Sequence, residues 1–247
     1  MSLDITASPD PVTGTVALSL EASTNVVTLT RSDTNGTRPV RLPAGALPAS
    51  GTLTLKDFEP ALAGQVQYRA YTATEEASAW VTLGAQLPRF VMPSIPLYSV
   101  EVDTVHAYTA TRSARATVHD VVGRRDPIVV QGVMGTRRGV LGVVCDSYND
   151  VMRVETIMKR GQTVFYRQSE HAGTDMYFSP LEVSTAPASG KWEVTVNYVE
   201  LDYPTGPVQS DPAWTFQKLA STATTFAGVA TDYTDFASLA LNQKKTP

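Results

Sequence analysis

Short segments rich in valine, leucine and threonine follow one another through the first third of the chain, and no helical period interrupts them. Turn-forming residues separate these segments, and the clearest turn contains the pair Asn35-Gly36, which tolerates positive φ. Short strands at this spacing predict a mainly β fold that begins with a small β-sandwich over residues 1–87. The predicted strands are residues 15–20, 25–30, 39–42, 52–56, 66–72 and 79–83.

Two of these segments also carry a family resemblance. The sequence LKDFEP at 55–60, followed by QVQYRA at 65–70, resembles the strand, corner and strand of fibronectin type III domains. In that family a proline follows the turn, and a tyrosine opens a strand whose alternate residues face the core. The resemblance implies a fibronectin type III or immunoglobulin-like sandwich, with Tyr68 in the core or at the corner.

Three prolines lie within the run PRFVMPSIP at residues 88–96. Proline fixes φ and removes a backbone donor, so the run is expected to form neither a central strand nor a helix. It therefore predicts a linker between two domains.

The second predicted domain, residues 97–204, is mostly strand with one helix at about 147–160. Continuous apolar runs at 127–133 and 139–145 predict strands that are buried on both faces. The alternation of Trp192, Val194, Val196 and Tyr198 predicts a half-buried strand. The helix has an N-cap candidate in Asp146-Ser147, a Gly stop at Gly161, and an apolar stripe formed by Val151, Val154, Ile157 and Met158.

A C-terminal arm over residues 205–247 carries three ten-residue repeats. Each repeat places an aromatic residue three positions before an aliphatic one, which predicts a single apolar helical turn. A turn this short is not stable alone, so we expect the arm to dock on a partner or to fold back onto its own second domain. The predicted docking residues are Trp214, Phe216, Leu219, Phe226, Val229, Phe236 and Leu239.

Composition excludes several classes of function. The chain of 247 residues is 43% hydrophobic and has a net charge of −4, without a strongly basic face, so no nucleic-acid specificity is expected. No stretch approaches the ~18 apolar residues of a membrane span, and the N-terminus lacks the pattern of a secretory signal. The single Cys145 excludes an internal disulfide and is expected to be a buried, inert thiol.

Catalytic and metal-binding patterns are also missing from the sequence. Asp103 with His106, or Glu170 with His171, could act as an acid and a base, but nothing nearby supplies a nucleophile or an oxyanion donor. The three histidines and Cys145 do not have the spacing of zinc ligands. We therefore predict a protein that is not an enzyme and that needs no cofactor or metal.

From Gly123 onward, short features occur in a defined order. GRRDPIVV at 123–130 is followed by a TRRG turn at 136–139, a strand, the predicted helix, and a strand that ends in Arg167. A GTDMY turn at 173–177 and the segments WEV at 192–194 and YVE at 198–200 complete the order. This order resembles the minor tail proteins of long-tailed phages that infect actinobacteria. The closing repeats are similar to tandem repeats in the same group, with phenylalanine here in the usual place of tryptophan.

The resemblance implies a structural virion protein of the tail tip. Residues 97–204 would form a tail-tube-like or distal-tail-like β domain, of which three or six copies form a ring or collar around the tail axis. The implied partners are copies of the same chain and the adjoining tail-tube and tail-tip proteins. Pairing of exposed sheet edges between copies would protect those edges from aggregation.

Two arginine pairs are the candidate subunit interface. Arg124, Arg125, Arg137 and Arg138 are expected to form ion pairs across the subunit boundary, with Asp126, Glu200 or Asp202 as candidate carboxylates. A phosphate site is the weaker interpretation of the same arginines.

A glycan-binding module for the host cell wall is the alternative function. Carbohydrate sites use exposed aromatic rings beside planar polar groups, and the candidates in the first domain are Trp80, Tyr68 and Tyr71.

Overall fold

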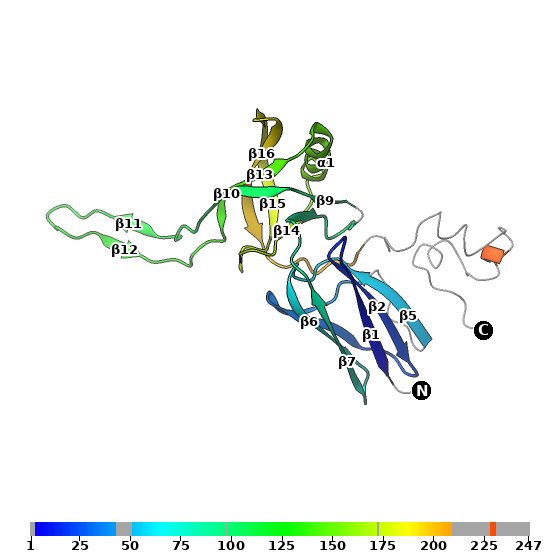
Figure 1. Cartoon of the computed structure of the whole chain (residues 1–247). Coiled ribbons are helices and arrows are strands. Elements are labelled where there is room, and N and C mark those ends of the chain that lie inside the picture. Colours follow the sequence, from blue (N-terminus) through cyan, green and yellow to red (C-terminus); the bar gives the residue numbers. More distant parts are fainter. Residues whose placement is uncertain (1–2, 43–50, 97, 172, 209–227, 231–247) are drawn as a thin grey trace. The chain divides into compact units, whose positions relative to one another are not determined.

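The computed structural model describes residues 3–42, 51–96, 98–171, 173–208 and 228–230 (Figure 1). The protein is mainly β, as the sequence predicts. The chain divides into two compact units. Unit 1 contains Met1–Glu101, Phe165–Met176 and the chain from Pro204 onward. Unit 2 consists of Val102–Val164 and Tyr177–Tyr203. Unit 2 is thus an insertion in unit 1.

Unit 1 contains a three-stranded and a four-stranded antiparallel sheet, and buried side chains of both sheets form one core. Two sheets around one core are the arrangement of a β-sandwich. The predicted strand at 39–42 is wrong apart from its first residue, because the strand there is Gly36–Pro39. The edge strand β1 (Asp4–Asp10), which contains Pro9, was not predicted. One sheet has the order β1 (Asp4–Asp10), β2 (Thr15–Ala22), β5 (Gly51–Asp57), and the other the order β4 (Gly36–Pro39), β3 (Thr28–Asp33), β6 (Gly64–Tyr71), β7 (Glu76–Leu83).

A buried polar network lies inside the sandwich. The Arg31 guanidinium donates to both carboxylate oxygens of Asp57, at 2.9 and 2.8 Å, and the Tyr68 hydroxyl donates to Asp57 Oδ2 at 3.0 Å. Burial raises the pKa of Tyr68 well above its ordinary value, and the negative charge of Asp57 adds to the effect. Tyr68 therefore lies in the core, as expected, and its ring is not available to a ligand.

The prediction of a linker at 88–96 is wrong for its central residues. Arg89–Val91 form strand β8, which is buried and pairs with β14 (Val164–Arg167) on one side and β9 (Ser99–Glu101) on the other. The prolines at 88 and 93 flank the strand instead of lying within it. The three residues of β8 keep their backbone N–H groups, so the strand forms without conflict with the rule for proline.

Arg167, at the end of β14, anchors this strand in unit 1. Its side chain is fully buried, and the guanidinium donates to the carbonyl oxygens of Gly14 and Pro60 at 2.8 Å each and of Thr13 at 3.2 Å. The side chain of Asn35 donates to Asp175 at 2.7 Å. These bonds explain why residues 165–176 belong to unit 1 rather than to the second domain predicted at 97–204.

In unit 2, four antiparallel strands have the order β10 (Thr104–Thr111), β13 (Arg138–Cys145), β16 (Lys191–Leu201) and β15 (Met176–Ala188). Helix α1 (Tyr148–Met158) begins after Ser147, whose hydroxyl accepts from the Asp150 backbone N–H at 3.3 Å. The predicted helix and its stripe are confirmed, because Val151, Val154, Ile157 and Met158 are its buried residues. No helix in the described residues is long and apolar enough to cross a membrane.

Candidate functional site

The chain between β10 and β13 forms a long β-hairpin, residues 112–137, which we call the hairpin arm. The β10–β13 pairing ends at Thr111 opposite Arg138, and the two chains of the arm meet again at the bridge of Ala114 with Met134, after a register shift of one residue. Further out, β11 (Thr117–His119) pairs with β12 (Ile128–Val130) as a separate two-stranded sheet. In Figure 1 the arm extends away from the β10 and β13 strands of its own unit.

A tight turn closes the outer end of the arm. The Arg124 backbone N–H donates to the Val121 carbonyl oxygen at 3.1 Å, and Gly123 has φ of +83°, in the region that favours glycine. Asp120 and Asp126 flank this turn, one on each chain of the hairpin. We call residues 120–126 the apex.

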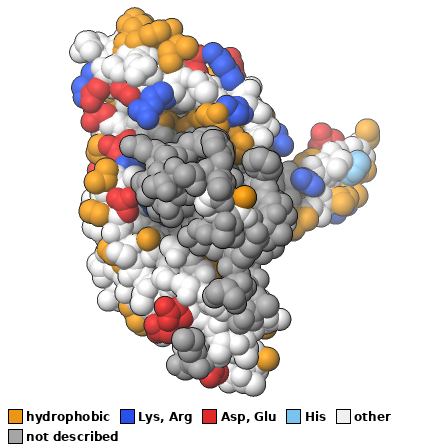
Figure 2. Space-filling model, turned by 90° about the vertical axis from the view of Figure 1, so that its right-hand side faces the viewer, with side chains coloured by type: hydrophobic (Ala, Val, Ile, Leu, Met, Phe, Trp, Pro, Cys, Tyr) orange, Lys and Arg blue, Asp and Glu red, His pale blue; other side chains and the backbone are white. Residues whose placement is uncertain are grey.

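Apolar side chains of the arm are exposed to solvent. Every residue from 109 to 134 is exposed. The relative solvent accessibility is 58% for Val118 and 103% for Val122, so Val122 is as accessible as in an extended chain. Figure 2 shows the projecting arm at the right, with hydrophobic and charged side chains together on its surface. The prediction that residues 127–133 form a strand buried on both faces is therefore wrong, because no second layer of described residues covers the hairpin. The other exposed apolar residues are Val121, Ile128, Val129, Val130, Val133 and Met134.

The structure separates the two predicted arginine pairs by the length of the arm. Arg124, Arg125 and Asp126 lie at the apex, whereas Arg137 and Arg138 lie where the arm joins the sheet. The four arginines thus do not form one cluster. Arg112 and Arg115, which were not predicted from the sequence, lie at the same end of the arm as Arg137 and Arg138. The occurrence of basic residues on both sides of a predicted apolar strand is the signal that could have found them.

Glu200 on β16 pairs with Arg137 in its own chain. Arg137 Nε and Nη2 donate to Glu200 Oε1 at 2.8 and 2.6 Å, and Arg112 Nη2 lies 3.7 Å from Glu200 Oε2. Burial opposes ionisation of Glu200, but the hydrogen bonds from Arg137 outweigh it and lower the pKa of the carboxyl. The ion pair that we expected between subunits is thus already formed within one subunit.

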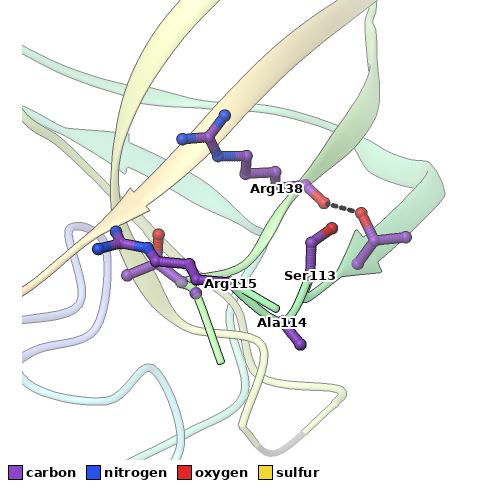
Figure 3. A pocket seen from close by; sticks show the side chains of 7 residues that line it. Ser113, Ala114, Arg115 and Arg138 are labelled. Atoms are coloured by element: carbon purple, nitrogen blue, oxygen red, sulfur yellow. Dashed lines mark hydrogen bonds between the residues drawn. The ribbon is translucent and has the colours of Figure 1, made fainter. Parts of the chain in front are cut away.

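Arg115 and Arg138 line a pocket of about 190 Å³ at the base of the arm. Their guanidinium groups have no acidic partner among the described residues. Figure 3 shows both side chains extending to the same side of the pocket, with Ser113 and Ala114 on the opposite side. The Thr111 hydroxyl donates to the Arg138 carbonyl oxygen at 3.0 Å and fixes the backbone at this point. Gly135 and Thr136 complete the lining.

The predicted docking residues of the C-terminal arm fall almost entirely outside the described residues. This applies to Trp214, Phe216, Leu219, Phe226, Phe236 and Leu239. Val229 is the exception, because it lies in the helical segment 228–230 and is half-buried.

The residues considered for catalysis have other partners. The Asp103 carboxylate accepts from Lys191 Nζ at 2.5 Å, and His106 Nε2 lies 2.5 Å from Glu193 Oε1. Burial, with a contribution from nearby carboxylates, raises the pKa of the Cys145 thiol to about 11. Within the described residues, no group of three histidine, cysteine or acidic side chains could hold a metal ion.

Among the glycan candidates, Trp80 is accessible and Tyr68 is not. Trp80 on β7 is 61% exposed and lies opposite Gln67 of β6. Tyr71 is half-buried at the far end of β6.

The fold and the site together define a class of mainly β protein with a projecting hairpin that has apolar residues at its surface. No protein-family model matches the sequence, and a search of curated proteins finds no similar chain.

Proposed function

We propose that the protein is a non-enzymatic structural subunit that assembles with copies of itself through the hairpin arm. The exposed apolar surface of the arm is the observation that carries this proposal. Monomeric soluble proteins rarely expose contiguous apolar patches of more than roughly a few hundred Å², and patches above that size mark interaction surfaces. Covering eight apolar side chains, at ~1.5–3 kcal/mol for each one that becomes fully buried, would contribute on the order of 10 kcal/mol before ordering costs.

The order of motifs in the second half of the sequence supports a more specific role in the tail tip of a long-tailed phage. In this role, three or six copies form a ring or collar around the tail axis and hold adjoining tail-tube and tail-tip proteins. The protein would be made in the cytoplasm of the bacterial host and reside in the virion. An arm that extends from each subunit to the next is a simple way to close such a ring.

The proposal is tested by shortening the arm in the full-length chain. Because Ala114 and Met134 are directly opposite each other, residues 115–133 can be replaced by an Asn-Gly turn without disturbing β10 or β13. We expect the unaltered protein to form a closed oligomer by multi-angle light scattering and electron microscopy, and the shortened protein to be a monomer with unchanged secondary structure. Equal oligomerisation of both proteins would overturn the proposal.

Substitutions on each face of the arm then locate the contact. Val118 and Val129 are paired in the hairpin and share one face, whereas Ile128 and Val130 lie on the other. Threonine at either pair retains the β propensity of the arm and removes apolar surface. Val12→Thr with Val27→Thr is the matched control, since these valines are 75% and 62% exposed in unit 1.

Glycan binding is the second candidate function, and the exposure of Trp80 favours it. An exposed indole beside the Gln67 amide has the chemistry of a sugar-stacking site. The full-length protein and its Trp80→Ala variant should be compared on an array of cell-wall glycans. Binding that is lost in the variant supports this function, and no binding by either protein excludes it.

A further inference from the structure

The base of the hairpin arm has an excess of positive charge. Four arginines lie there, and Arg112 and Arg137 share the single carboxylate of Glu200. Arg115 and Arg138 have no acidic partner among the described residues, although both line the same pocket. The segment 112–138 holds six of the 20 basic residues of the chain but two of its 24 acidic residues.

The size and lining of the pocket favour one carboxylate as its occupant. A volume of about 190 Å³ is below the ~300 Å³ at which ligand pockets usually begin, so the pocket suits a side chain better than a cofactor. Guanidinium groups bind carboxylates through paired, charge-assisted hydrogen bonds. The hydroxyls of Ser113 and Thr136 offer further donors beside Arg115 and Arg138.

Carboxylates without a basic partner occur at the other end of the same arm. Asp120 and Asp126 flank the apical turn, are exposed, and have no ion-pair partner among the described residues. Asp120 follows Arg115 by five residues in an extended chain, which corresponds to roughly 17 Å. Because the pocket and these carboxylates lie on one extended hairpin, they cannot meet within a single subunit.

We propose that the pocket formed by Arg115 and Arg138 binds an apex carboxylate, that of Asp120 or Asp126, of a second copy of the chain. This inference rests on the proposed self-assembly and specifies which residues make the contact between subunits. The contact joins two different surfaces, so each subunit gives an apex to one neighbour and accepts an apex from another. Such a head-to-tail contact produces a ring when the rotation between subunits closes.

Charge reversal tests the contact in the full-length protein. We expect Arg115→Glu with Arg138→Glu to weaken assembly at least tenfold, and Asp120→Arg with Asp126→Arg to weaken it as much. The chain that carries all four substitutions restores the opposite charges and should assemble again. Arg153→Glu, at a 61% exposed position on α1, is the control and should have no effect.

The outcomes separate this inference from the proposed function. If charge reversal leaves assembly unchanged but the Asn-Gly shortening abolishes it, the carboxylate contact is wrong and the arm is still the assembly element. If free inorganic phosphate protects Arg115 from chemical modification but the apex variants assemble normally, the pocket binds a small anion and the contact is again wrong.

Cross-linking gives a readout that is independent of charge. A chain with both Ser113→Cys and Arg125→Cys, which keeps both apex carboxylates, should form disulfide-linked dimers and higher multimers after oxidation, whereas Ser113→Cys alone should not. The buried Cys145 does not interfere. Absence of linked multimers from an assembled double variant would contradict the proposed contact.

Discussion

Arg137 and Glu200 connect the base of the hairpin arm to the neighbouring β16 strand by four hydrogen bonds. Two come from the guanidinium, and a third is donated by the Arg137 backbone N–H to Glu200 Oε2 at 3.0 Å. The fourth is donated by the Glu200 backbone N–H to the Arg137 carbonyl oxygen at 2.8 Å. The Tyr108 hydroxyl accepts a further bond from Arg137 Nη1 at 3.2 Å. Three of these four bonds between Arg137 and Glu200 therefore depend on a single carboxylate.

Glu200→Gln should destabilise unit 2 without unfolding unit 1. The amide cannot replace a carboxylate that accepts from both the side chain and the backbone of Arg137, and a hydrogen bond to a charged group contributes about 1.5–3 kcal/mol. Hydrogen exchange measured by mass spectrometry should show faster exchange in β13 and β16 and unchanged exchange in β2 and β6. The control is Glu182→Gln, because Glu182 makes one exposed bond to Asn197.

The same carboxylate makes unit 2 sensitive to acid. The pKa of Glu200 is lower in the folded protein than in the unfolded chain, so its contribution to stability is complete above the unfolded value of about 4.3. That contribution is lost as the pH falls through the folded pKa. Urea unfolding between pH 3 and pH 6 should show a smaller loss at low pH for Glu200→Gln than for the unaltered protein. Parallel curves for the two proteins would contradict this prediction.

Removal of Arg31 should unfold the sandwich. Arg31 is 2% exposed and bonds both oxygens of Asp57, so Arg31→Met leaves a buried carboxylate without its counter-ion. Breaking a buried pair in this way costs about 3–5 kcal/mol. Arg69→Met is the matched control, because Arg69 lies 3.7 Å from Glu76 on the exposed surface, where a pair contributes less than about 1 kcal/mol. Equal melting temperatures for the two variants would show that the buried pair does not stabilise the sandwich.

Arg167→Met should detach residues 165–176 from unit 1. The guanidinium is held by three backbone carbonyl oxygens, and those acceptors would remain buried without a donor. Burial, together with the positive charge of Arg89, lowers the pKa of Arg167 to about 10, so the group is still charged at neutral pH. We expect new protease cleavage between 165 and 176 in this variant. Arg153→Met should not produce such cleavage.

The Cys145 thiol should be unreactive in the folded protein. Cys145 is 1% exposed and its pKa is raised to about 11, so very little thiolate exists at pH 8. A thiol-specific reagent should label it only after urea unfolding. Because the unfolded chain ionises first, stability should fall as the pH rises above the unfolded thiol value of about 8.5. Rapid labelling of the native protein would contradict this prediction.

Local patterns in the sequence predicted the elements that bury one face. The helical stripe that begins at Val151 and the alternation from Trp192 to Tyr198 are confirmed, because periodicity reports which side of an element meets a core. The Asn35-Gly36 pair likewise lies at the connection of β3 and β4.

The hairpin arm could not be predicted in the same way. The run that contains Ile128–Val130 has the composition of a buried strand, and periodicity alone does not reveal whether a second layer covers it. The pocket of Arg115 and Arg138 depends on the register of β10 with β13, which brings together residues that are 23 positions apart in the chain. The interruption of unit 1 depends on side chains such as Arg167, whose partners lie more than 100 residues away.

The insertion of unit 2 into unit 1 has a consequence for biosynthesis. When Glu101 has left the ribosome, β9 can already pair with one edge of β8, but β14, which pairs with the other edge, becomes available only after the whole segment 102–164 has emerged. During this time β8 lacks its pairing with β14, although the hairpin arm, with its exposed valines, is already outside the ribosome. Nascent chains arrested at increasing lengths should thus acquire a native, protease-resistant N-terminal sandwich with β8 in place only after residue 176 has emerged.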